Sequence, residues 1–154
     1  MLLVELAIGS APFIAGMGAA WATVASGKQE RERPCGCPAK WQPPSWVFRV
    51  VWPLLYILLG VVGVRIWQRT HRMLSMQMVS WTTLVAAIVL WWPVFNIWCN
   101  PTAAFGTLVV IALGSLYVAA KTRMWLLLSP LCTWLAFASV LSFQVMRGIC
   151  ACGY

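Results

Sequence analysis

The chain has 154 residues, 62% of them hydrophobic and 9% charged, with a net charge of +8 and a mean hydropathy of +0.82. Because a soluble domain carries about a quarter charged residues, this composition excludes that class and predicts an all-α integral membrane protein. The positive charge does not indicate nucleic-acid binding. The Lys and Arg residues divide almost evenly between the two sides of the predicted topology, which fits contact with lipid headgroups and leaves the orientation open.

Five apolar segments reach the length of about 20 residues that a membrane-crossing helix needs. Long continuous apolar runs indicate helices rather than the strands of a barrel. The connections between most of them are short, which predicts antiparallel neighbours in one five-transmembrane-helix bundle. We expect a single domain over residues 1–154, with an extended first loop at 26–45 and spans at 2–25, 46–67, 76–99, 102–120 and 124–146.

The first segment has two interpretations. Ala19, Ala20 and Ala22 resemble the cleavage region of a secretory signal. However, no basic residue precedes the segment, and Glu5 stands where such a signal carries positive charge. We therefore expect a transmembrane helix here.

The second span carries an aromatic and glycine-lined face. Trp52, Tyr56, Gly60, Gly63 and Trp67 follow one another at helical spacing and share one side of the helix. Glycines allow a close approach, either of a ligand or of another helix. The spacing alone favours helix packing.

Two motifs resemble the translocator protein family, also called tryptophan-rich sensory proteins or peripheral-type benzodiazepine receptors. The first is W-Q-P-P-S-W-V-F-R-V-V-W-P-L-L-Y-I-L-L-G at 41–60, and the second is S-P-L-C-T-W-L-A-F-A-S-V-L-S-F at 129–143. The eleven tryptophans fit the family's name. The positions that fill the two family patterns are Trp41, Pro43, Pro44, Trp46, Trp52, Leu55, Tyr56 and Gly60, then Pro130, Trp134, Phe137, Ala138 and Leu141.

Three departures identify a divergent member. The segment L-W-W-P-V-F-N-I-W at 90–98 is aromatic but out of register with the family's third span. Ser142 and Phe143 stand where the family has Asn-Tyr, and the first loop lacks the family's Trp-Tyr. The resemblance therefore supports the bundle, but not a lid made by the first loop.

The resemblance implies a receptor or sensor that binds flat hydrophobic ligands in a pocket opening toward the first loop. These ligands are porphyrins or other tetrapyrroles, including haem-type ligands, and also sterols and benzodiazepine-type drugs; transport of such ligands is an associated role. No cofactor is required. The resemblance also implies a homodimer and either the mitochondrial outer membrane or a bacterial membrane. The expected ligand-binding residues are Trp41, Pro43, Pro44, Trp46, Trp52, Tyr56, Phe105, Trp134, Ala138, Leu141 and Phe143.

The residue types themselves fit this chemistry. Aromatic rings can stack on a macrocycle, and Ala138 and Leu141 offer a shallow apolar surface near Trp134. Gln144 is expected to bond a neighbouring helix, whereas Ser142 fits packing and cavity lining equally. Sterol binding is less favoured than porphyrin binding, because Phe143 lacks the phenol of the sterol-recognition motif, itself a weak pattern.

Catalysis finds little support in the sequence. The single histidine, His71, lies in a short loop, and no pair of acids is placed for general acid–base work. The alternative function is a light-dependent porphyrin-degrading enzyme that uses Trp52 and Trp134, as some bacterial relatives are thought to do. A transporter is a third class, but no inverted repeat is visible. We favour binding over catalysis.

Two Cys-x-Cys pairs remain outside the resemblance. Cys35 and Cys37 lie in the first loop, and Cys150 and Cys152 lie in the tail. Five spans place both on one side of the membrane, where four thiols could form disulfides or a soft-metal site. Free thiols and lipidation of the tail pair are the alternatives.

Overall fold

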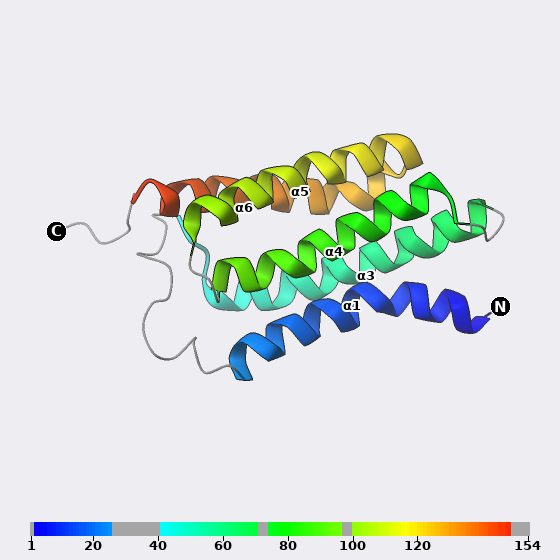
Figure 1. Cartoon of the computed structure of the whole chain (residues 1–154), viewed down its shortest axis with the longest axis horizontal. Coiled ribbons are helices and arrows are strands. Elements are labelled where there is room, and N and C mark those ends of the chain that lie inside the picture. Colours follow the sequence, from blue (N-terminus) through cyan, green and yellow to red (C-terminus); the bar gives the residue numbers. More distant parts are fainter. Residues whose placement is uncertain (1, 26–40, 71–73, 97–99, 149–154) are drawn as a thin grey trace.

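The computed structural model describes residues 2–25, 41–70, 74–96 and 100–148. Each of its helices is long and apolar enough to cross a membrane, so the predicted five-helix architecture is confirmed (Figure 1). The predicted boundaries agree to within two residues, apart from 97–99 at the end of the third span, which lie outside the described residues. The helices are α1 (Leu2–Ala25), α3 (Ser45–Arg69), α4 (Met76–Asn96), α5 (Pro101–Thr122) and α6 (Trp125–Met146).

Local sequence signals set several helix ends. Pro44 is extended (φ −55°, ψ 146°) ahead of α3, and its carbonyl accepts a hydrogen bond from the Val47 amide at 3.0 Å. Asn100 caps α5 by accepting from the Ala103 amide at 3.0 Å. Pro101 follows at a position whose missing amide hydrogen leaves no bond unmade. Arg123 ends α5 in the left-handed conformation (φ 55°), and the tight connection makes α5 and α6 antiparallel.

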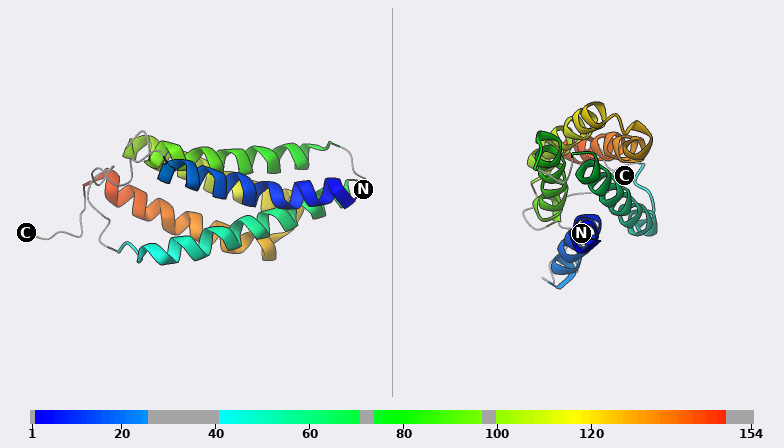
Figure 2. Two further views of the ribbon diagram at one scale, coloured as in Figure 1. Left: turned by 90° about the horizontal axis from the view of Figure 1, so that it is seen from below. Right: turned by 90° about the vertical axis from the view of Figure 1, so that its right-hand side faces the viewer.

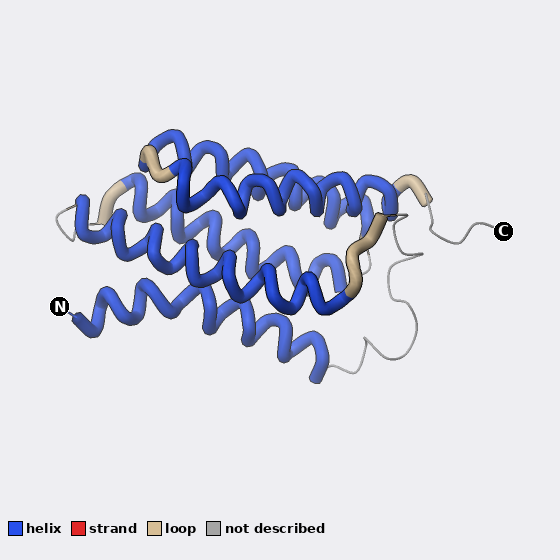
Figure 3. Tube along the Cα trace, turned by 180° about the vertical axis from the view of Figure 1, so that it is seen from behind, coloured by secondary structure: helices blue, strands red, loops and turns tan. Residues whose placement is uncertain are grey.

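The helices form a ring. α1 packs on α3 and α4, α5 packs on α4 and α6, and α3 closes the ring against α6. The end-on view in Figure 2 shows α1 as the outlying member. α1 is also the least buried helix, with Leu3 and Trp21 largely exposed. Figure 3 shows that the described residues outside helices are short connections at the two ends of the bundle.

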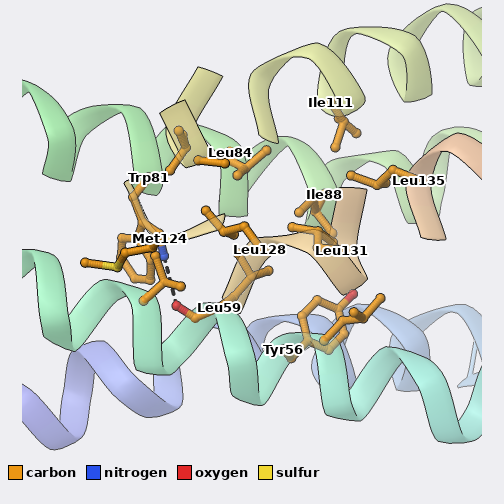
Figure 4. Close-up of a cluster of buried hydrophobic side chains, with 14 of the residues drawn as sticks. Tyr56, Leu59, Trp81, Leu84, Ile88, Ile111, Met124, Leu128, Leu131 and Leu135 are labelled. Atoms are coloured by element: carbon orange, nitrogen blue, oxygen red, sulfur yellow. Dashed lines mark hydrogen bonds between the residues drawn. The ribbon is translucent and has the colours of Figure 1, made fainter. Parts of the chain in front are cut away.

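Aliphatic side chains from α3, α4, α5 and α6 fill the centre of the ring. Leu59, Leu128 and Leu135 are at most 1% exposed. Trp81 of α4 also points inward, and its indole N–H donates to the Leu59 carbonyl at 3.0 Å (Figure 4). This hydrogen bond satisfies the indole N–H in a region without water, so burying it does not carry the free-energy cost of an unpaired polar group.

Glycines bring α1, α3 and α4 close together. A methyl group at Gly60 of α3 would overlap the carbonyl of Gly9 on α1. A methyl group at Gly63 would meet the ring of Trp81. The packing interpretation of the glycine face is therefore confirmed, because both glycines lie against neighbouring helices.

Candidate ligand-binding site

Aromatic side chains from three helices lie in the half of the bundle toward the end where α3 and α5 begin and where α4 and α6 end. Figure 1 shows these helix ends. We call these residues the aromatic cluster. They come from the first half of α3, the last two turns of α4 and the middle of α6. The members are Phe48, Trp52, Tyr56, Trp91, Trp92, Phe95, Trp134 and Phe137.

One part of the cluster is a row of nearly parallel rings. The Trp52 ring lies 5.7 Å from that of Tyr56 at 29° and 6.1 Å from that of Trp91 at 26°. Phe95 continues the row, 5.3 Å from Trp91 at 17°. Offset parallel rings at these distances attract one another. The row therefore joins α3 to α4.

The other part joins α3 to α6. The Trp134 ring lies 5.4 Å from Phe48, edge to face at 69°, and 5.6 Å from Phe137 at 45°. Phe48 precedes Trp52 by one helical turn. Trp52 and Trp134 are therefore brought to the same region, although their rings are not in contact with each other among the described ring pairs.

The cluster is buried or half-buried and contains no charged side chain. Trp52 and Trp91 are 7% and 8% exposed, and the Trp91 indole N–H donates to the Ala104 carbonyl at 3.2 Å. Arg147 is exposed at the end of α6 with its guanidinium 5.5 Å from the Phe143 ring, and Glu5 lies at the opposite end of the bundle. Such surroundings suit the binding of an apolar ring compound rather than acid–base chemistry.

The expected site residues divide into those near the cluster and those away from it. Ala138 and Leu141 are each 8% exposed on the side of α6 that carries Trp134. Trp41 and Trp46 are 70% and 59% exposed at the entrance to α3. Pro43 is half-buried and Pro44 is exposed.

The structure does not bring Phe105 and Phe143 to the cluster. Their rings pair with each other across α5 and α6 at 5.5 Å. Phe143 follows Trp134 by nine residues, which is two and a half turns of helix, so it lies on the opposite side of α6. It is also 38% exposed.

Five cluster residues are not among the expected ligand-binding residues, namely Phe48, Trp91, Trp92, Phe95 and Phe137. Phe137 fills a family pattern, whereas the other four lie outside both patterns, so the family motifs do not indicate the contribution of α4. A signal was nevertheless present. Phe48 and Trp52, like Trp91 and Phe95, are four residues apart and therefore share a helix face.

Several expected features fall outside the described residues. These are His71 and the four thiols of Cys35, Cys37, Cys150 and Cys152. The ends of α1 and α6 that lead toward the two cysteine pairs lie at the aromatic end of the bundle (Figure 1). The proposed link between loop and tail stays a prediction.

Comparison with known proteins places the chain in a family. The model of the TspO/MBR family matches residues 11–147. Protein CrtK of Rhodobacter capsulatus is 28% identical over 116 residues, covering 70% of this chain and 71% of that protein. Tryptophan-rich protein TspO of Archaeoglobus fulgidus is 30% identical over 107 residues, covering 67% and 70%. The human translocator protein is 29% identical over 115 residues, covering 70% and 68%. The chain is therefore a multi-pass integral membrane protein and belongs to the TspO/MBR family.

Proposed function

We propose that this protein binds flat, hydrophobic ring compounds of the porphyrin type at the aromatic cluster. Family membership supports a membrane protein of the sensor or translocator type. The observation that carries the ligand proposal is the row of nearly parallel rings at Trp52, Trp91 and Phe95. A planar macrocycle stacks on such faces, and their neutral surroundings favour it over a charged metabolite.

Binding to porphyrin is tested most directly by absorbance titration of the purified protein with protoporphyrin in mild detergent, with a sterol as comparator. We expect saturable binding of the porphyrin and weaker binding of the sterol. Replacement of both Trp52 and Trp134 by Leu should weaken porphyrin binding by about 1–3 kcal/mol per lost ring, taking the scale of base–aromatic stacking. Leu keeps the helices apolar, so the bundle should persist.

The matched control is a double replacement of Trp21 and Trp125 by Leu. These tryptophans are 74% and 49% exposed and lie outside the cluster. The control protein should bind porphyrin as the wild type does. Unchanged affinity after loss of Trp52 and Trp134 would contradict the assignment of the site. Illumination of the bound sample, with product analysis, tests the light-dependent alternative.

A further inference from the structure

Helix α6 carries buried polar atoms that are left unpaired. Within the described residues, the Trp134 indole nitrogen, the Ser142 hydroxyl and the Gln144 amide oxygen have no hydrogen-bond partner. In a membrane no bulk water reaches such atoms, so each unmade bond costs free energy. Buried polar atoms normally have a hydrogen-bond partner, and a bound ligand could supply the one that is missing here.

The Ser142 hydroxyl differs from the other hydroxyls on these helices. Seven of them donate to the carbonyl four residues earlier at 2.7–2.9 Å, namely those of Ser10, Ser80, Thr82, Thr83, Thr107, Thr122 and Ser139. Ser139 is on α6 itself, one turn before Ser142, and donates to Leu135. The same backbone bond is the ordinary way for a helical hydroxyl to be satisfied. Ser142 is 4% exposed and does not use it.

The Trp134 indole differs in the same way from the indoles of Trp81 and Trp91. Trp81 donates to the Leu59 carbonyl, and Trp91 donates to the Ala104 carbonyl. Trp134 has neither a backbone acceptor nor a side-chain acceptor among the described residues. An indole nitrogen can only donate, so its partner must be a hydrogen-bond acceptor.

The two groups lie about two turns apart on α6. Ser142 follows Leu131, Leu135 and Ala138 at helical spacing, and all of these are buried on the inward side of α6. Trp134 precedes Ser142 by eight residues, which is a rise of about 12 Å. Gln144 lies on another side of α6, where the packing role expected from the sequence stays a prediction.

We infer that Trp134 and Ser142 are the two polar contacts for the ligand of the proposed function, on which this inference rests. The ligand class is a flat apolar ring system that carries at least two polar atoms. The atom facing Trp134 is a neutral acceptor such as an ester or ketone carbonyl, because a charged group at membrane depth is costly. The atom facing Ser142 either accepts or donates, since a hydroxyl does both.

A matched pair of porphyrins tests this inference. Etioporphyrin carries only alkyl groups, whereas coproporphyrin tetramethyl ester has the same macrocycle with an ester carbonyl on every pyrrole. Wild-type protein should bind the ester more tightly. Ser142→Ala should weaken ester binding roughly three- to ten-fold, the range for a single hydrogen bond, and should leave etioporphyrin binding unchanged.

Ser139→Ala is the control, because its hydroxyl is already satisfied by the backbone. It should change the affinity for neither porphyrin. Trp134→Phe is the second variant: it keeps a ring for stacking and removes the N–H, so it should again affect the ester more than etioporphyrin. Thermal melting of each variant confirms folding. If Ser142→Ala fails to fold, the inference is tested by the affinities of Trp134→Phe for the same two porphyrins.

The outcomes separate this inference from the proposed function. If neither porphyrin binds the wild-type protein, the proposed function is wrong. If both bind, but the variants leave the ester affinity unchanged or weaken both porphyrins equally, the polar contacts assigned to Trp134 and Ser142 are wrong. If the variants bind the ester more weakly but bind etioporphyrin as before, the proposed function and the two assigned polar contacts are both supported.

Discussion

At the scale of single residues, the absence of a side chain at Gly60 sets the distance between α1 and α3. The Gly9 carbonyl occupies the space in which a methyl group at Gly60 would lie. The obstacle is backbone rather than the flexible tip of a side chain, so it cannot turn aside. α1 therefore keeps its place only if residue 60 has no Cβ.

Gly60→Ala should lower the free energy of unfolding by about 1–3 kcal/mol, the usual cost of overpacking. The measurement is thermal or denaturant unfolding in mild detergent. Gly18→Ala serves as the control, because a methyl group there would meet nothing within 4 Å. Equal stability of the two variants would show that α1 does not depend on this contact.

At the scale of elements, α5 is held at both ends by groups outside its regular hydrogen bonds. Asn100 caps its first turn. At its other end, Arg69 of α3 donates to the Thr122 carbonyl at 3.1 Å, and Gln77 of α4 donates to the Lys121 carbonyl at 3.3 Å. The last carbonyls of a helix lack intrahelical partners, and a cation there also opposes the helix dipole. Neighbouring helices thus fix the C-terminal end of α5.

Arg69→Met should destabilise the bundle by about 1–2 kcal/mol, because it removes a charged donor from an unpaired helix carbonyl. Amide hydrogen exchange should also rise in the last turn of α5. Arg65→Met is the control, since Arg65 is exposed on the same helix and makes no hydrogen bond within the described residues. If both substitutions lower the stability equally, the loss of stability comes from removing a positive charge near the membrane interface and not from removing the bond to the α5 carbonyl.

At the scale of the whole molecule, α4 presents small residues on its outer side. Thr83 and Ala86 are exposed, whereas Ala87 is half-buried and packs against the core. A dimer interface through the third span is expected from Thr83 and Ala87, but a bulky Trp81 on that surface would hold two helices apart. Trp81 is instead buried inside its own bundle. The outer side of α4 therefore offers small side chains to a second copy, and the homodimer stays a prediction.

Thr83→Trp should shift the protein from dimer to monomer, because a large ring prevents close approach at a small-residue interface. Cross-linking and size-exclusion chromatography in mild detergent measure the shift. Val110→Trp on α5 is the control, as Val110 is 67% exposed on a different helix. A wild-type protein that is monomeric throughout would exclude the dimer under these conditions.

The sequence by itself determined the spans, the family and the end of the bundle toward which the aromatic cluster lies. Hydropathy is a local property, so five apolar runs could be read without knowledge of packing. Antiparallel succession then brings the start of α3 and the end of α6 together. For that reason Trp52 and Trp134 could be assigned to one region before any contact was known.

Only the tertiary structure decided which side of each helix faces inward. In a membrane helix, the sides that face lipid and the sides that face the core are both apolar, so periodicity carries little information about rotation. Rotation is set instead by contacts between distant segments, such as Gly60 with Gly9 and Trp81 with Leu59. Those contacts place Trp91 beside Trp52 and turn Phe143 toward Phe105 of α5, because a helix is rigid and each rotation moves all its side chains together.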